Sequence, residues 1–249
     1  MIGLLSATGL SYTYRRLAAV NGVDLHVPAG ARHALVGPNG AGKTTLLHLL
    51  AGTLRPKAGR IRLSGRDITR TCPARRARLG IGRSFQTPAL LDSLTVLDNL
   101  ILATWRHTGA GGWAPARYRT LARRGLDQLD PLGLAGHAHQ LAGSLPHGQR
   151  RLLDIAVALA GAPKLLLLDE PAAGLPDADL PRLLTALCDL PAGTAVVLVE
   201  HNLDVVAAFA AEVTVLHHGR IVATGSPADI AAHPTVREVY LGTPDGAVG

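Results

Sequence analysis

The chain has 249 residues, of which 47% are hydrophobic and 17% are charged, and its formal net charge is +7 at pH 7. This length and composition suit a globular protein with a full hydrophobic core and exclude a disordered chain. A membrane-spanning helix requires an apolar run of about 18 residues, and the sequence has none. Its start also lacks the charged-then-apolar order of a signal peptide, so we expect a cytosolic protein.

This excess of positive charge is typical of proteins with a negatively charged partner, either nucleic acid or an anionic membrane surface. Only Lys43, Lys57 and Lys164 of the 25 basic residues are lysine, and such heavy arginine use is also explained by a GC-rich genome. Cys72 and Cys188 lack metal or redox spacing, so we expect two thiols, buried or free, and no disulfide.

The first third of the chain predicts strands around one helix. Residues 17–27 (LAAVNGVDLHV) and 31–37 (ARHALVG) alternate apolar and polar residues, which indicates strands in an antiparallel arrangement that ends in a buried one. Residues 43–54 (KTTLLHLLAGTL) predict a helix that Gly52 closes, or Pro56 soon after. A strand at 60–65, a brief helix at 74–80 and a strand at 81–85 follow.

The pattern changes to helices broken by glycine and proline from residue 87 to about 143, as in 93–105 and 116–130, which we interpret as an inserted helical subdomain. Helices at 149–160, 180–190 and 203–212 then alternate with strands at 164–170, 194–200 and 213–219. Parallel strands need crossover helices and are buried on both faces. The alternation therefore predicts a parallel sheet covered by helices.

The segment GPNGAGKT, Gly37 to Thr44, fits the pattern G-x-x-x-x-G-K-[ST] between a predicted strand and a predicted helix. The glycines let successive backbone N–H groups converge on phosphate oxygens, with the positive end of the helix behind them. Lys43 would reach the terminal phosphates, and the Thr44 hydroxyl would bind Mg²⁺. The alternative is a glycine-rich turn without a ligand.

The segment LLLLDEP, residues 165–171, supplies the second half of a phosphate site. It is a hydrophobic strand that ends in Asp169 and Glu170, at the carboxyl edge of a parallel sheet where ligands gather. We interpret Asp169 as the metal-supporting carboxylate and Glu170 as the general base that acts on water. The alternative is an ordinary solvated loop start.

The segment SLPHGQRR, residues 144–151, begins an amphipathic helix. A helix N-terminus offers free N–H groups and partial positive charge, Gly148 lets a phosphate come close, and Pro146 suits a first turn. The alternative is a cap on a core helix. We expect Arg150 and Arg151 to lie on a solvated helix face.

Together these motifs resemble the ATP-binding-cassette (ABC) ATPases over nearly the whole chain. The resemblance implies one α/β domain: a P-loop NTPase (RecA-like) core with a parallel sheet, an N-terminal antiparallel β subdomain and an inserted helical subdomain. The implied limits are 1–86 and 160–225 for the nucleotide-binding core with the β subdomain, 87–159 for the helical subdomain with the signature motif, and 226–249 for a C-terminal helical tail.

The resemblance also implies roles for single residues. ATP would be bound by the A-loop, the Walker A motif and the signature: Tyr14, Asn39, Gly40, Ala41, Gly42, Lys43, Thr44, Thr45, Leu145, Gly148 and Gln149. Mg²⁺ would be held by Thr44, Asp169 and the Q-loop residue Gln86, and catalysis would involve Glu170, Gln86 and the H-loop residue His201. Tyr12 could stack on adenine in place of Tyr14, Gln86 could be a plain surface glutamine, and His201 could be structural.

Two cassettes of this family dimerise head to tail, and each signature helix points at the γ-phosphate in the other P-loop. Here Pro146 replaces the signature serine and removes a charged hydrogen bond of about 1.5–3 kcal/mol. Pro176 replaces the usual D-loop aspartate, with Asp177 one place later. The partner cassette is a copy or a paralogue, and both departures favour a paralogue.

Three segments resemble the importer cassettes for branched-chain amino acids and related solutes such as amides or urea: 84–100 (SFQTPALLDSLTVLDNL), 169–175 (DEPAAGL) and 233–242 (HPTVREVYLG). This resemblance implies a peripheral ATPase at the cytoplasmic face of the inner membrane. Its partners would be integral membrane permease subunits and, indirectly, a solute-binding protein.

Residues 103–126 contain five arginines, no acid, and both Trp105 and Trp113, which suits an anionic leaflet, a membrane subunit or nucleic acid. The second function class is therefore a cassette ATPase of translation or DNA repair. A single cassette, with only 58 residues between Gln86 and Leu145, argues against it. A P-loop kinase would leave LPHGQ and His201 unexplained.

Overall fold

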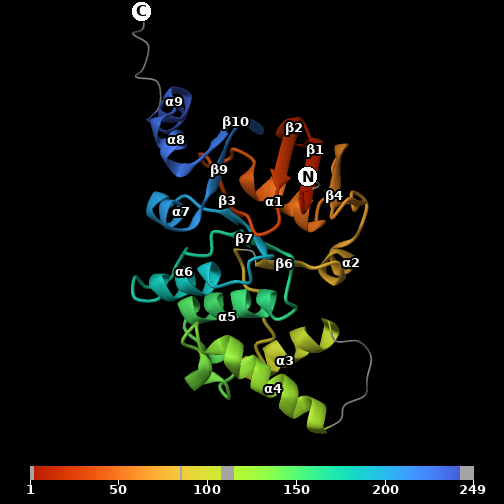
Figure 1. Ribbon diagram of the computed structural model, residues 1–249, viewed down its shortest axis with the longest axis vertical. Helices are drawn as coiled ribbons and strands as arrows, with labels where there is room; N and C mark the ends of the chain where they lie inside the picture. The colour runs from red at the N-terminus through yellow and green to blue at the C-terminus, as the bar shows by residue number, and fades with distance from the viewer. Residues whose placement is uncertain (1–2, 85, 108–114, 242–249) are drawn as a thin grey trace, which may run out of the picture.

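The computed structural model describes residues 3–84, 86–107 and 115–241 (Figure 1). The strands are β1 (Leu5–Tyr14), β2 (Leu17–Val27), β3 (Arg32–Val36), β4 (Ala58–Leu63), β5 (Arg66–Asp67), β6 (Ile81–Ser84), β7 (Leu165–Asp169), β8 (Ala195–Val199), β9 (Glu212–His217) and β10 (Arg220–Gly225). The helices are α1 (Lys43–Ala51), α2 (Pro73–Arg78), α3 (Val96–His107), α4 (Pro115–Leu129), α5 (His147–Leu159), α6 (Leu180–Cys188), α7 (Leu203–Phe209), α8 (Pro227–Ala232) and α9 (Pro234–Leu241), with short 3-10 turns η1 (Ala135–His137) and η2 (Ala142–Ser144).

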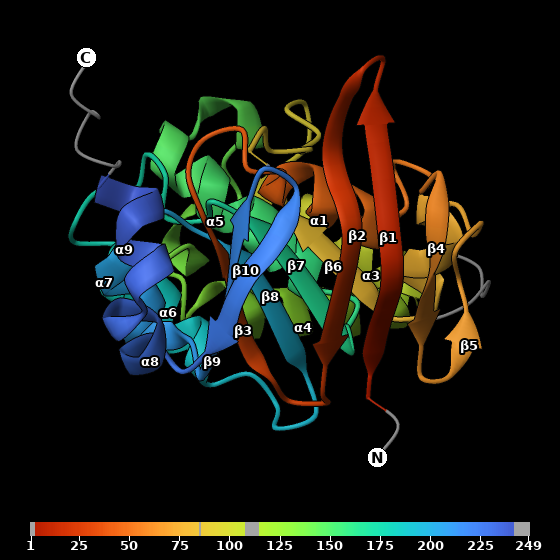
Figure 2. The ribbon, with the colours of Figure 1, turned by 90° about the horizontal axis from the view of Figure 1, so that it is seen from above.

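A six-stranded sheet in the order β10-β9-β3-β8-β7-β6 forms the centre of the molecule, and β10 is its antiparallel edge (Figure 2). The side chains of β7 and β8 are fully buried and alternate between two cores. Leu166, Leu168 and Leu198 pack with the helices on one face, whereas Leu167 and Val197 pack with α1 on the other. This burial on both faces explains the continuous apolar runs of these strands.

A second sheet, antiparallel and in the order β2-β1-β4-β5, packs beside α1. Residues 31–37 were predicted to belong to this antiparallel arrangement, and that prediction is wrong. The segment forms β3, which pairs parallel with β8 and β9 in the other sheet, with Ala34 opposite both Leu198 and Val213. A strand of five residues reads alike in either sheet, because its partner strands β8 and β9 lie far along the chain.

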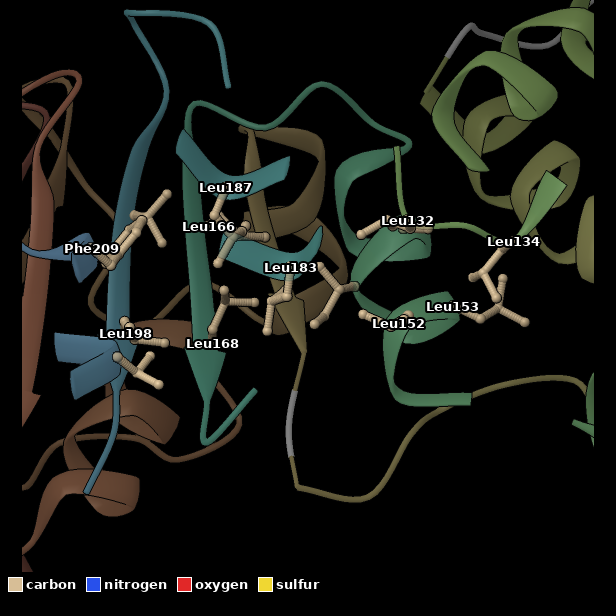
Figure 3. Packing of buried hydrophobic residues seen from close by; sticks show 14 of the residues in the cluster. Leu132, Leu134, Leu152, Leu153, Leu166, Leu168, Leu183, Leu187, Leu198 and Phe209 are labelled. Atoms are coloured by element: carbon tan, nitrogen blue, oxygen red, sulfur yellow. The ribbon is translucent and has the colours of Figure 1, made fainter. Parts of the chain in front are cut away.

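Helices α3 and α4 form the lower part of the molecule in Figure 1, and α5 lies between them and the central sheet. Leu152 and Leu153 of α5 pack in the same core as Leu132, Leu134 and the β7 leucines (Figure 3). None of the helices in the described parts of the chain combines the length and apolar character needed to cross a bilayer. Trp113 lies outside the described residues.

The carboxyl end of α1 is joined by Arg76 to the segment that follows β5. Its guanidinium is buried (1% exposed) and donates to the carbonyl oxygens of Leu49 and Leu50 at 2.7 Å and of Ile68 at 2.8 Å. Burial lowers the pKa of Arg76 to about 10, so the group stays charged at neutral pH. Gly52, one of the two predicted stops, ends α1 and adopts the left-handed conformation. Cys72 and Cys188 are free and exposed.

Candidate nucleotide-binding and catalytic site

The phosphate-binding loop joins β3 to α1, as the sequence predicts. Gly37 has φ 146°, and Gly42 caps the helix with φ 105°. A Cβ atom at Gly37 would overlap the carbonyl oxygen of Leu216 on β9, and one at Gly42 would overlap that of Ala19 on β2. Only glycine fits at these two positions. The close approach of β9 and β2 therefore constrains the curled shape of the loop.

The other residues of the loop differ in exposure. Asn39 and Gly40 are exposed, Thr45 is half-buried in the first turn of α1, and Ala41 is buried. The carbonyl oxygen of Ala41 accepts a hydrogen bond of 2.9 Å from the amide of Gly219, which follows β9. The polar, solvent-facing part of the loop is therefore its middle.

Lys43 lies inside the curl of the loop. Its Nζ donates to the carbonyl oxygens of Gly37 at 2.7 Å and Pro38 at 3.1 Å, and the residue is 7% exposed. Burial lowers the pKa of Lys43, while the carboxylates of Glu170 and Asp169 act in the opposite direction. A cation is thus held close to two acids, where phosphate oxygens would give it better partners than carbonyls do.

Asp169 ends β7 and is buried (1% exposed). The Thr44 hydroxyl donates to its Oδ1 at 3.4 Å, so α1 and β7 bring these two predicted metal ligands together. Burial raises the pKa of Asp169, and the hydrogen bond from Thr44 opposes that shift. One carboxylate and one hydroxyl fit Mg²⁺, which usually keeps waters and takes its other ligands from substrate phosphates.

Glu170 follows β7 in the left-handed conformation, with φ 50°. Its amide donates to the carbonyl of Val199 at 2.8 Å, which fixes it against the end of β8. His201 follows β8, and its Nδ1 lies 3.8 Å from Glu170 Oε1. The side chains of Glu170 and His201 are 23% and 64% exposed, so both are open to solvent at the edge where the P-loop lies.

Glu200 is a site residue that the sequence reasoning missed. It is 1% exposed and accepts hydrogen bonds from the amides of Ala172 at 3.0 Å and His201 at 3.1 Å. The carboxylate thereby ties the loop after β7 to the loop after β8. The signal was present, because AVVLVE, like LLLLDE, is an apolar parallel strand that ends in an acid.

The position of Arg151 differs from the prediction. We expected a solvated helix face, yet Arg151 is 1% exposed and its Nη2 donates to the carbonyl oxygens of Asp169 and, at 3.0 Å, Glu170. Arg150 is half-buried and forms an ion pair of 2.7 Å with Asp92. The sequence does not distinguish two adjacent arginines at a helix start. The packing of α5 on β7 determines that Arg151 is buried and Arg150 is not.

Gln86 lies two residues after β6 and is exposed. Its flanks are held by Asp154 of α5, which accepts hydrogen bonds from the Ser84 hydroxyl at 2.5 Å and the Ala89 amide at 3.0 Å. Burial raises the pKa of Asp154, and those two hydrogen bonds oppose that shift. The Q-loop is therefore anchored on both sides to the helix that the signature motif begins.

The signature residues begin α5, with Pro146 as the N-cap and His147 as the first helical residue. We expected Pro146 in the first turn, and it lies just before that turn. Leu145 and Gly148 are buried, and the Gln149 Nε2 lies 3.3 Å from His137 Nε2. Among the described residues, no hydrogen bond joins the signature to the P-loop of the same chain.

Tyr14 ends β1 and is 47% exposed. Its ring meets that of Tyr12 edge to face, with 4.9 Å between centroids. Tyr12 is half-buried and packs against the core beside α1, so Tyr14 offers the more open ring face for a base to stack on.

A P-loop that opens a helix after β3, with a carboxylate pair at the end of β7, a parallel strand of the same sheet that is separated from β3 by β8, defines a nucleotide-binding P-loop NTPase. The family description "ABC transporter" matches residues 20–173, and "Branched-chain amino acid ATP-binding cassette transporter" matches residues 220–246. The chain belongs to the ABC transporter family of ATP-binding cassettes, and it is an ATPase of that family.

Similar proteins agree with this assignment. The chain is 34% identical to the high-affinity branched-chain amino acid transport ATP-binding protein BraF of Pseudomonas aeruginosa, over 96% of this chain and 98% of that protein. It is 35% identical to the lipopolysaccharide export system ATP-binding protein LptB of Acidithiobacillus ferridurans, over 97% and 98%. A solved nucleotide-free ATP-binding cassette from an ABC transporter superimposes with a TM-score of 0.83 at 29% identity, over 96% of this chain and 99% of the other. The predicted fold class is confirmed.

Proposed function

We propose that this chain is the ATP-binding and ATP-hydrolysing subunit of an importer for branched-chain amino acids or related small polar solutes, such as amides or urea. One observation carries the ATPase part. Lys43, the Thr44–Asp169 pair and the Glu170–His201 pair gather from α1, β7 and β8 at one edge of the sheet. The importer part rests on the similarity to BraF and on the match at residues 220–246.

Each group has a separate task at this edge. The loop amides and Lys43 bind the phosphates, and Tyr14 stacks on adenine. Thr44, Asp169 and Gln86 would hold Mg²⁺, which neutralises developing charge on the phosphates when bound. Glu170 accepts a proton from the attacking water, and His201 beside it contacts the γ-phosphate.

The site is completed by a second cassette, since in the described part of the chain no hydrogen bond joins the signature to its own P-loop. Leu145, Gly148 and Gln149 would face nucleotide held by the partner cassette, which is a copy or a paralogue of this chain. Gly148 leaves room for a phosphate, and the α5 N-terminus offers free N–H groups. Pro146 supplies no hydrogen bond there, so this chain contributes the weaker signature.

Nucleotide-driven closure would transmit force to membrane subunits. Residues 87–159 would act as the helical subdomain, 1–86 and 160–225 as the core with the β subdomain, and 226–249 as the tail, of which 242–249 lie outside the described residues. The helical subdomain would turn with Gln86 and move integral permease subunits. The chain would then sit peripherally at the cytoplasmic face of the inner membrane, with a solute-binding protein as an indirect partner.

Lipopolysaccharide export is the second candidate function, because LptB is as similar to this chain as BraF is. The match at residues 220–246 favours the importer. The relatives named above are transport subunits, and they give no support to a nucleic-acid or ribosome role.

The test is ATPase activity of the chain assembled with its membrane subunits in proteoliposomes. We expect a solute-binding protein loaded with leucine, an amide or urea to raise ATP turnover and to drive uptake of that solute. Stimulation by lipopolysaccharide alone would assign the export role. Retention of the chain on nucleic acid at physiological salt, without association with membrane subunits, would overturn the proposal.

A further inference from the structure

Helix α5 has a buried polar face that the proposed mechanism does not use. Arg151 and Asp154 lie three residues apart on it, and they are 1% and 5% exposed. Buried charged groups are costly unless they are well bonded. Here their bonds run to the two segments that carry Glu170 and Gln86.

Arg151 holds the end of β7. Its guanidinium donates to the carbonyl oxygens of Asp169 and Glu170, which are the last strand residue and the first residue after it. Glu170 has φ 50°, a conformation that is strained for a non-glycine residue and persists only where surrounding contacts enforce it. These two hydrogen bonds fix the peptide planes on both sides of the Glu170 Cα, and therefore the direction of its side chain.

Asp154 holds the Q-loop in the same way. Its two carboxylate oxygens accept from the Ser84 hydroxyl at 2.5 Å and from the Ala89 amide at 3.0 Å, on either side of Gln86. The pair therefore spans from β7 to β6 through one helix. Both partners in the catalytic segments are backbone groups or a small hydroxyl, so the contacts set position and leave the reacting side chains free.

The first turn of α5 contacts the loop after Glu170 as well. A Cβ atom on Gly148 would lie 2.9 Å from Pro176 Cδ, and one on Gly174 would lie 3.1 Å from His147 Nδ1. The signature end of α5 is thus packed tightly against the D-loop, one turn before Arg151. A displacement of the signature cannot occur without moving either that loop or the Arg151 hydrogen bonds.

We propose that Arg151 and Asp154 are positioning residues through which α5 sets the geometry of Glu170 and Gln86 in the same chain. The inference rests on the proposed function, since it takes Glu170 as the base. It adds a route between the two sites of a dimer: a signature that contacts the partner's nucleotide would, through α5, adjust the catalytic glutamate of its own chain.

The experiment uses Arg151→Met, Arg151→Lys and, as a matched control on the same helix, Arg150→Met in the assembled transporter. Displacement of a catalytic group by a weakened supporting contact costs about 10- to 100-fold in rate. We expect Arg151→Met to lower kcat by that factor while the Kd for ATP changes less than about threefold. Arg151→Lys keeps a charged donor group but loses the planar guanidinium, so it should fall between Arg151→Met and the wild type, and Arg150→Met should match the wild type.

A merely structural role for Arg151 gives a different result, because general loosening would weaken ATP binding and the rate together. Equal kcat in Arg151→Met and the wild type would overturn the inference. If Arg151→Met does not fold, Ser84→Ala decides the matter, since it removes one hydroxyl at the Asp154 end. We expect a lower kcat for that variant, again with ATP affinity retained, and an unchanged kcat would overturn the inference.

Hydrogen exchange on the nucleotide-free chain separates this inference from the proposed function. Loss of the Arg151 contacts should speed exchange in peptides covering 169–175 and leave those covering α1 unchanged. An assembled wild-type complex without ATPase activity would defeat the proposed function, yet the exchange comparison would still decide the Arg151 role. Identical exchange in Arg151→Met and the wild type would overturn that role.

Discussion

The Nδ1 atom of His201 lies 3.8 Å from Glu170 Oε1 and 3.9 Å from Glu200 Oε2, so one imidazole stands between the carboxylates at the ends of two neighbouring strands. The two acids differ in their surroundings. Glu200 is 1% exposed and bonded to backbone amides, whereas the Glu170 side chain is 23% exposed and accessible to water. The arrangement gives Glu200 a structural task and supports the proposal that Glu170 is the proton acceptor.

Replacement of Glu170 by glutamine should lower ATP turnover by about 10²- to 10⁴-fold, the usual contribution of a general base. The neutral amide keeps the shape of the side chain, so nucleotide binding should persist and an ATP-bound dimer should accumulate. Turnover and size-exclusion elution with ATP measure both effects. Glu238→Gln, on the exposed side of α9, is the control, and a Glu170→Gln enzyme with normal turnover would refute the base assignment.

Replacement of Pro146 by serine should raise the ATPase rate of the assembled dimer. Serine at an N-cap restores a side-chain acceptor for the first turn of α5 and a hydroxyl that can donate to the partner's phosphate. A charged hydrogen bond of about 1.5–3 kcal/mol corresponds to roughly a 10- to 100-fold ceiling on the gain. An unchanged rate in Pro146→Ser would contradict the view that this chain has a weakened signature.

Replacement of Arg76 by alanine should lower the free energy of unfolding by about 3–5 kcal/mol, since it leaves several buried carbonyls without a donor. Chemical denaturation of the isolated chain measures the change. Arg78→Ala, two residues away and exposed, should stay within about 0.5 kcal/mol of the wild type. Equal losses for the two variants would show that the carbonyl contacts of Arg76 contribute nothing.

The stability of the fold should fall in mild acid because of His33 on β3. This imidazole is 1% exposed, lies between Glu212 Oε2 at 3.0 Å and Thr214 Oγ1 at 2.9 Å, and burial lowers its pKa from the usual 6.5. Below pH 6.5 the unfolded chain therefore binds more protons than the folded one, and the free energy of unfolding decreases as the pH falls.

The His33 contribution is measured from thermal unfolding midpoints between pH 5 and 8. His33→Gln should flatten the acid side of that profile, and His26→Gln, at an exposed position on β2, should leave it as in the wild type. Parallel profiles for His33→Gln and the wild type would assign the acid sensitivity to other groups.

Much of this architecture could be predicted because its signals are local. The P-loop and LLLLDE each fit within eight residues, and their strand and helix flanks follow from apolar periodicity. The structure confirms strands at β7, β8 and β9 and helices at α3, α4, α5, α6 and α7 close to the predicted limits. The Thr44–Asp169 contact follows from two motifs that end at the same sheet edge.

The remainder depends on contacts between distant residues. β1 and β10 were not predicted: β1 mixes polar and apolar residues across three register shifts, and β10 is a half-exposed edge strand. The sheet to which β3 belongs is set by β8 and β9, more than 150 residues later. Arg151 is buried because α5 packs on β7, and the local sequence QRR does not predict this contact.

The glycines of the P-loop have a further consequence for how the protein is made. Gly37 lies against the carbonyl of Leu216, and Gly42 against that of Ala19. The amide of Gly219 also donates to the carbonyl of Ala41, so some of the residues that shape the loop come about 180 positions later in the sequence. During translation the phosphate-binding loop leaves the ribosome early, whereas β9 and Gly219, which contact the loop, are synthesised much later. ATP therefore cannot help the first half of the nascent polypeptide to fold. A fragment that stops before β9 should be unable to bind ATP, although it contains Lys43, Thr44 and Asp169.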